Sequence, residues 1–141
     1  KIEDSSNKNI NFKRIRIRNL INYLKSEGLD LEKLRQTIDN LSDSNFTINH
    51  YVNENIKYNS KYFEHKRHYI LSSNFFNQPH EIVFRSIVYL FKKVGNKYYS
   101  PRGKSVDMLI SKFGSGEIKK INISGCILEK INNSFIIYKE K

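Results

Sequence analysis

The chain has 141 residues, of which 38% are hydrophobic and 13% aromatic, and this composition predicts one folded, soluble domain or two small ones. No run of about 18 apolar residues occurs, which argues against a membrane span, and no signal-peptide pattern is present. The single cysteine, Cys126, excludes an internal disulfide and is typical of a reducing compartment, so we expect a cytoplasmic protein. Because the first residue is Lys1, we expect a piece of something longer.

The net charge of +11 is distributed unevenly along the chain. Residues 1–60 carry 10 basic and 8 acidic side chains, whereas residues 61–141 carry 15 basic and 6 acidic ones. The chain contains no alanine and is rich in Ile, Lys, Asn and Tyr, which is typical of an AT-rich genome and raises the lysine content whatever the function. Codon bias alone should not separate charge in this way, so the second half favours a polyanionic partner.

The first half predicts two helices after a polar loop over residues 1–12. Ile17, Leu20, Ile21 and Leu24 follow helical spacing, and Gly28 stands where a left-handed glycine ends many helices, so we expect a helix over 13–27. Arg14 and Arg18 share one face of it.

Asp30 is a suitable N-cap for a long amphipathic helix over 31–57. Its apolar positions follow a 3–4 spacing: Leu31, Leu34, Ile38, Leu41, Ile48 and Val52. We expect this stripe to be buried in the core, and a groove that binds a partner is the alternative.

The second half predicts two more helices and a small β element. Residues 58–78 are aromatic and basic, and we expect 69–71 to be extended. A helix from Pro79 at its first position to Gly95 follows, and Arg85 on it is either a paired edge residue or an RNA contact. We expect a short helix over 104–113, a strand over 118–123, and a hairpin from Cys126–Ile131 and Phe135–Tyr138. The predicted fold is therefore mainly α: a bundle of four to five helices with a C-terminal β-hairpin or three-stranded sheet.

The sequence contains no complete catalytic or metal-binding motif of a familiar kind. Gly103-Lys104-Ser105 resembles the end of a phosphate-binding loop, but that motif needs a glycine where Tyr98 stands. His65, His68 and Cys126 lack the further ligands of a zinc site, and no acid pair or catalytic triad can be assembled. We expect no metal site and no catalytic residue in this chain, and a structural role for Cys126.

Basic residues interleaved with aromatic ones are the remaining signal. Tyr98, Tyr99, Arg102 and Lys104 lie in one loop region, and the residues that could surround it are Lys66, Arg67, Lys92, Lys93, Lys97, Lys119 and Lys120. Lysine and arginine neutralise phosphates and tyrosine stacks on exposed bases. No helix-turn-helix or zinc-finger spacing favours DNA, so we expect RNA.

Taken in order, several segments resemble the tRNA(Ile)-lysidine synthetase family. They are Glu3-Asp-Ser-Ser-Asn7 with Phe12-Lys-Arg-Ile-Arg-Ile-Arg18, Ser26-Glu-Gly-Leu-Asp-Leu-Glu-Lys-Leu34, Pro79-His-Glu-Ile-Val-Phe-Arg85, Tyr99-Ser-Pro-Arg102 and Ser124-Gly-Cys126. The resemblance covers essentially the whole chain. Ser5 and Ser100 replace prolines of the family pattern, and Ser124 replaces a glycine.

The resemblance implies an enzyme that uses ATP, with Mg, to join lysine to the wobble cytidine of an isoleucine tRNA with a CAU anticodon. The family's Ser-Gly-Gly-x-Asp-Ser loop and His-x-x-Asp-Asp segment do not occur here. The resemblance therefore implies that this chain is a C-terminal portion that positions tRNA and is inactive alone. The ATP and lysine sites would lie in a missing N-terminal domain. Arg14 and Arg18 would lie nearest that domain, and Arg102 and its neighbours would contact the tRNA body.

We accordingly expect three segments: 1–28 as the end of the catalytic domain, 29–95 as a helical tRNA-positioning domain, and 96–141 as the basic loop, short helix and hairpin. The expected RNA contacts are Arg14, Arg18, Arg85, Tyr99, Arg102, Lys104, Lys119 and Lys120. The alternative is a stand-alone basic helical interaction module, or a gene remnant, with no catalytic role.

Overall fold

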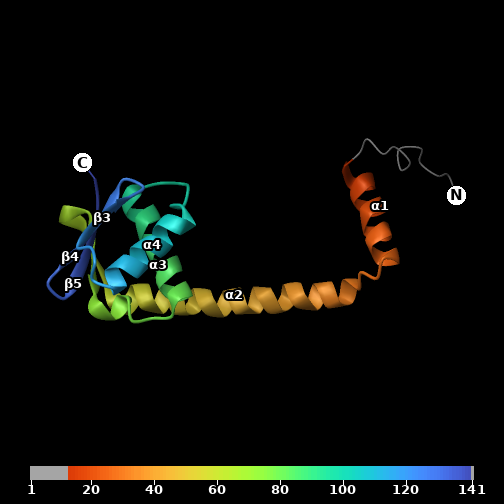
Figure 1. Cartoon of the computed structure of the whole chain (residues 1–141), viewed down its shortest axis with the longest axis horizontal. Helices are drawn as coiled ribbons and strands as arrows, with labels where there is room; N and C mark the ends of the chain where they lie inside the picture. Colours follow the sequence, from red (N-terminus) through yellow and green to blue (C-terminus); the bar gives the residue numbers. More distant parts are fainter. Residues whose placement is uncertain (1–12, 141) are drawn as a thin grey trace. The chain divides into compact units, whose positions relative to one another are not determined.

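The computed structural model of the chain describes residues 13–140 (Figure 1). The chain divides into two compact units, residues 1–44 and 45–141, and the division falls inside a long helix. Each unit is described by itself. The loop expected over residues 1–12, with its Glu3–Asn7 motif, lies outside the described residues.

The first unit contains two helical segments that match the sequence pattern closely. Helix α1 spans Lys13–Ser26, and the chain then turns at Gly28, whose φ of +96° is the left-handed conformation predicted for it. Helix α2 spans Leu31–Asn59. The Asp30 carboxylate accepts hydrogen bonds from the backbone N–H groups of Glu32 (2.9 Å) and Lys33 (3.2 Å), which confirms Asp30 as the N-cap.

The apolar stripe of α2 is not buried along its whole length. Leu34, Ile38 and Leu41 are 43%, 57% and 65% exposed, so the expectation of a core position is wrong for this part of the stripe. Val52 is buried in the second unit, as expected. The periodicity is uniform along α2, and its C-terminal turns pack against the core of the second unit.

The second unit is built on a five-stranded antiparallel sheet with the strand order β1-β2-β5-β4-β3. Its strands are β1 (Ser60–Phe63), β2 (His68–Ser72), β3 (Lys120–Ile123), β4 (Cys126–Ile131) and β5 (Ser134–Lys139). The predicted hairpin β4–β5 and its neighbour β3 are present, and residues 69–71 are extended as expected. The sheet exceeds the expected two or three strands because β2 pairs with β5, and β1 then pairs with β2.

Two helices cover one face of this sheet (Figure 1). They are α3 (His80–Gly95) and α4 (Gly103–Gly114), preceded by single 3-10 turns at Glu64–Lys66 and Ser73–Phe75. The helices and the inner side of the sheet enclose one apolar core, whose fully buried members include Leu71, Phe75, Ile87, Leu90, Phe91, Leu109, Leu128 and Ile137. The mainly helical class with a C-terminal β element is thus confirmed, although α3 and α4 pack on a sheet rather than in a purely helical bundle.

The start of α3 differs by one residue from the sequence expectation, because Pro79 is the N-cap rather than the first helical residue. The helix ends at Gly95 as expected, and the left-handed Asn96 (φ +49°) follows it. Gly95 also has a packing role. A Cβ there would stand 3.1 Å from the Cys126 Sγ, so the absence of a side chain lets α3 approach β4 closely.

The sheet connects segments that are far apart in sequence. Strands β1 and β2 come from residues 60–72, and their partner β5 comes from residues 134–139, so one sheet extends across the expected boundary at residue 95. The expected functional boundaries at 28 and 95 stay predictions. None of the helices within residues 13–140 has the length and apolar character needed to cross a membrane.

Asn55 is a buried polar residue that connects the C-terminal part of α2 to the rest of the second unit. It is 3% exposed, and its side-chain amide donates hydrogen bonds to the Phe75 carbonyl (3.3 Å) and the Ser86 hydroxyl (3.2 Å). Its own carbonyl accepts a bond from the Asn59 side chain (2.9 Å). These bonds satisfy polar groups that could not otherwise be buried without cost.

We predict that Asn55→Ala lowers the free energy of unfolding by about 1–3 kcal/mol, since it removes these bonds and leaves buried partners unsatisfied. Urea denaturation followed by circular dichroism measures the change. Asn53→Ala is the matched control, because Asn53 is exposed on the same helix. Equal effects of the two substitutions would contradict the role assigned to Asn55.

Candidate nucleic-acid interface

The densest positive charge of the second unit lies on α3, the loop after it and the start of α4. Residues 82–106, which we call the basic stretch, contain six cations and no acidic residue. The cations are Arg85, Lys92, Lys93, Lys97, Arg102 and Lys104. The flanking acids are Glu81 and Asp107, and each has a cationic or histidine partner of its own.

The C-terminal end of α3 forms a shallow basic hollow. Tyr89, Lys92, Lys93, Asn96 and Lys97 line a space of about 300 Å³ with no acidic side chain among them. The Lys93 Nζ lies 5.8 Å from the centre of the Tyr89 ring. The lysines also suit the negative end of the helix dipole, and the left-handed turn at Asn96 directs the chain into the next loop. The hollow therefore offers cations and one aromatic face together.

The loop after α3 presents two tyrosines to solvent. Tyr98 and Tyr99 are 87% and 81% exposed, and their rings contact each other edge to face at 5.3 Å. Pro101 is buried and anchors the loop. Arg102 is the N-cap residue of α4, so Arg102 and Lys104 stand exposed at the start of that helix. Tyr99 and Arg102 thus lie in one loop and Lys104 in the first turn of α4, and all three are exposed.

Cys126 lies beneath this surface and is inaccessible to solvent. Its Sγ lies 3.6 Å from the Phe91 carbonyl oxygen. Burial raises the pKa of the Cys126 thiol, and the nearby charges of Lys97 and Lys139 oppose this only in part. A buried thiol held in its neutral form is a poor nucleophile, which agrees with the structural role expected for it. Lys97 and Lys139 thus both lie near Cys126, although 42 residues separate them in sequence.

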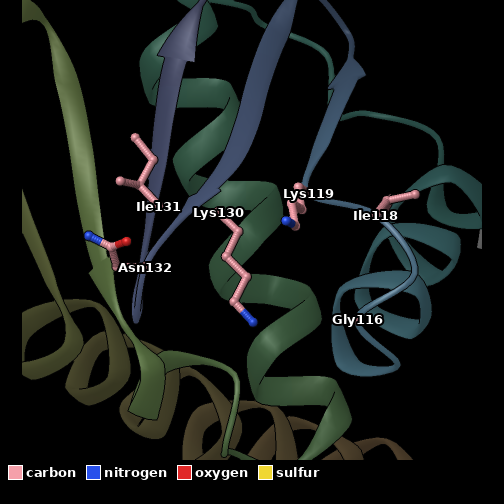
Figure 2. A pocket seen from close by; sticks show the side chains of 6 residues that line it. All are labelled: Gly116, Ile118, Lys119, Lys130, Ile131 and Asn132. Atoms are coloured by element: carbon pink, nitrogen blue, oxygen red, sulfur yellow. The ribbon is translucent and has the colours of Figure 1, made fainter.

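A second basic hollow lies where a turn joins β4 to β5 (Figure 2). Gly116, Ile118, Lys119, Lys130, Ile131 and Asn132 line a space of about 430 Å³. The side chain of Lys130 extends between Asn132 and Gly116, which lie on opposite sides of the view. The Lys130 N–H donates a 2.7 Å bond to the Lys119 carbonyl, so the two lysines are held side by side. Lys119 therefore lines a different hollow from the one that Lys92, Lys93 and Lys97 of the basic stretch line.

Arg85 is occupied by partners within the chain. Its Nε donates to Glu81 Oε1 (2.6 Å), and its Nη1 donates to Asn45 Oδ1 (2.6 Å) and Asn49 Oδ1 (3.2 Å). Of the two interpretations left open by the sequence, the structure shows the paired one: the guanidinium clamps α3 onto α2. This arrangement leaves Arg85 less available to RNA than Arg102.

The remaining expected contacts are dispersed. Lys120 lies on the sheet face that α3 and α4 leave uncovered, with its Nζ 3.5 Å from Glu129 Oε2. Hydrogen bonding to Tyr138 and the charge of Glu129 raise the pKa of Lys120. Arg14 and Arg18 are exposed on α1, which belongs to the first unit.

Sequence reasoning missed three residues of these surfaces: Tyr89, Lys130 and Lys139. Tyr89 precedes Lys92 and Lys93 by three and four positions, which is neighbour spacing on a helix and could have been noticed. Lys130 becomes a neighbour of Lys119 only through the pairing of β3 with β4, and Lys139 reaches Cys126 only through the pairing of β4 with β5. No local sequence signal reveals either pairing.

Comparison with known proteins identifies relatives over nearly the whole chain. A tRNA(Ile)-lysidine synthase of Wolbachia sp. subsp. Brugia malayi (strain TRS) is 27% identical over 146 residues, and one of Wolbachia pipientis wMel is 25% identical over 142 residues. Each match covers 99% of this chain, and the chain spans about a third (32%) of the length of either relative. No family model and no solved structure matches. The resemblance drawn from the motifs is confirmed by these relatives.

We predict that Arg85→Ala lowers the free energy of unfolding by about 1 kcal/mol, since it removes a partly exposed ion pair and two hydrogen bonds between α2 and α3. Arg102→Ala removes the same charge from a site with no such bonds and should leave stability within about 0.5 kcal/mol. Thermal unfolding of both variants makes the comparison. A loss no larger for Arg85 than for Arg102 would contradict the clamp.

Proposed function

We propose that this chain is the C-terminal, tRNA-binding portion of a tRNA(Ile)-lysidine synthase. The observation that carries the proposal is the similarity over 99% of the chain to two proteins of that name. In that family the parent enzyme would use ATP to join lysine to the wobble cytidine of the isoleucine tRNA with a CAU anticodon. This makes the parent a carbon–nitrogen ligase of tRNA modification.

The charge of the second unit supports tRNA as the partner. A stretch of 25 residues with six cations and no acid (residues 82–106) suits a polyanion. The two exposed tyrosines beside it can stack on unpaired bases, which duplex DNA does not offer. Phosphate neutralisation would supply affinity, and stacking would favour folded or single-stranded RNA.

The proposal assigns catalysis to the part of the enzyme that the relatives have beyond the matched third. ATP, Mg and lysine would bind there, and this chain would hold the tRNA while the wobble cytidine reacts. Arg14 and Arg18 on α1 would lie toward that part. A reducing, cytoplasmic location completes the proposal, supported by the single, unpaired cysteine.

We predict that the chain binds isoleucine tRNA with an affinity that falls steeply as salt rises, because binding releases counterions from phosphates. Replacing both Arg102 and Lys104 by alanine should weaken binding and reduce the slope of log affinity against log salt by about two, one for each lost phosphate contact. Filter binding or fluorescence anisotropy at several salt concentrations measures both quantities.

The matched control replaces Lys33 and Arg35 by alanine. These residues are exposed on α2 in the first unit, and their loss changes the net charge equally. If the control variant loses as much affinity as the Arg102/Lys104 variant, the binding reflects overall charge rather than this surface. Absent or salt-insensitive tRNA binding would refute the proposal.

The exposed stripe on α2 favours a second candidate, a helical interaction module. Leu34, Ile38 and Leu41 lie one helical turn apart on one face and are all at least 43% exposed. Exposed apolar stripes of this kind normally contact another polypeptide. The two candidates are compatible, since a tRNA-binding portion can also carry a protein contact.

If this stripe makes the chain self-associate, sedimentation velocity should show a dimer whose population rises with concentration. Ile38→Asp should abolish it, because a charge would be buried at the contact. Asn40→Asp, which introduces the same charge on α2 outside the 31–34–38–41 spacing, should not. A monomer at all concentrations would rule out self-association through this stripe, and tRNA binding would be the remaining candidate function.

A further inference from the structure

The face of the sheet that α3 and α4 leave uncovered has an unusual composition. Side chains alternate between the two faces along each strand, and the core members Leu71, Ile137 and Leu128 fix the inner one. The other set, which we call the open face, would ordinarily be polar. Instead it carries Phe63, His68, Ile70, Ile127, Ile136 and Tyr138, together with Lys61, Lys120 and Glu129.

Three rings cross the open face on neighbouring strands. Phe63 of β1 pairs with His68 of β2, and His68 pairs in turn with Tyr138 of β5. The Phe63 and His68 rings stack at 5.4 Å with an angle of 20° between their planes. Since adjacent strands are about 4.8 Å apart, the row of rings is long enough for two or three bases.

Cations accompany these rings. The Lys61 Nζ lies 5.4 Å from the centre of the Phe63 ring, and the Lys120 Nζ lies 5.9 Å from that of Tyr138. Lys66 and Arg67 follow in the short turn between β1 and β2, where the left-handed Arg67 (φ +48°) ends the 3-10 helix. A groove of apolar residues alone would suit a protein, but this mixture suits an anionic ligand with aromatic bases.

Two hollows lie along this face and have Lys66 in common. One, of about 300 Å³, is lined by Phe63, His68 and Ile70 with the turn residues. The other, of about 620 Å³, is lined by Arg67, Ile127, Tyr138, Lys139 and Glu140. Lys66 thus stands between two recesses, each of which has an aromatic wall.

The acidic residues near the face do not cancel its charge. Glu129 accepts a 2.9 Å hydrogen bond from the Tyr138 hydroxyl and pairs with Lys120, so its charge is compensated while the Tyr138 ring is held in place. Glu64 and Glu140 stand at the ends of the hollows. Against these three acids are five cations: Lys61, Lys66, Arg67, Lys120 and Lys139.

One cation from the larger hollow and one from the basic stretch lie near the same buried residue, Cys126. Lys139 lines the larger hollow, and both Lys139 and Lys97 act on the Cys126 thiol from nearby. Lys97 also lines the hollow at the end of α3. Cations of both surfaces, Lys97 and Lys139, are therefore present near Cys126.

We propose that the open face of the sheet binds a single-stranded segment of RNA, with two or three unpaired bases against Phe63, His68 and Tyr138 and phosphates at Lys61, Lys66 and Arg67. This rests on the proposed function in naming tRNA as the natural source of that segment. The inference adds to the proposed function a defined site for unpaired nucleotides. This site lies on a surface that does not include Tyr99, Arg102 or Lys104.

The test uses the full 141-residue chain and a fluorescent, unstructured RNA of about eight nucleotides, within the site sizes of single-strand binders. An RNA hairpin of equal charge is the comparison. The chain should bind the single strand more tightly than the hairpin. Replacing Phe63 and His68 by alanine should weaken single-strand binding roughly tenfold, because each lost stack costs about that much.

Matched variants separate the rings from other effects. Tyr138→Phe keeps the ring and should retain binding, whereas Tyr138→Ala should lose it. Phe46→Ala removes an aromatic ring that is 78% exposed and belongs to α2 rather than to a strand, and it should not change RNA affinity. Thermal unfolding of each variant checks that the fold is intact. Equal losses for Phe46→Ala and the Phe63/His68 variant would overturn the proposal.

A second measurement needs no variant. An RNA of the same length carrying 4-thiouridine, cross-linked by light to the unaltered chain, should attach to peptides that contain Phe63, His68 or Tyr138. Cross-links confined to Tyr98 and Tyr99 would overturn the site while leaving tRNA binding in place. Failure to bind whole tRNA would instead refute the proposed function. Face variants that change sedimentation but not RNA affinity would show that the face docks a protein, which also overturns the site.

Discussion

The pairing of β2 with β5 is the interaction on which the second unit depends. It joins residues 68–72 to residues 134–139 in an antiparallel register that places Leu71 opposite Phe135 and Tyr69 opposite Ile137. Without it, the β1–β2 and β3–β4–β5 segments would be separate, and isolated hairpins are at best marginally stable. With it they form one sheet broad enough to carry both α3 and α4. The same pairing sets His68 beside Tyr138, so core and candidate surface are fixed together.

Helices were predictable here because their signals are local. Asp30 and Gly28 marked ends that the structure confirms, and Pro79 and Gly95 marked the limits of a helix that the structure places at His80–Gly95. The hairpin β4–β5 was found because a short turn separates two apolar runs. Strand β1 was not, because Ser60–Phe63 has no clean alternation and pairs only with a strand that is itself defined by a distant partner.

For the candidate surfaces too, only features that depend on residues close in sequence were predictable. Tyr99, Arg102 and Lys104 are close in sequence, so their proximity in space was readable. The partners of Arg85 were not, because Asn45 and Asn49 lie 40 and 36 residues away. Burial of the α2 stripe also could not be read from periodicity: Ile38 and Val52 follow one pattern, yet only Val52 has neighbours to cover it. A repeat shows which residues share a face, and packing decides whether that face is covered.

The position of β5 has a consequence for how the chain reaches its native state. It is the last of the described strands in chain order and yet occupies the centre of the sheet. Strands β1 and β2 leave the ribosome more than 60 residues before it and have no central partner until it appears. Such long-range pairing slows folding and leaves strand edges unpaired meanwhile. The edge strands β1 and β3 carry Lys61 and Lys120. Charges of this kind keep unpaired strand edges from pairing with other chains.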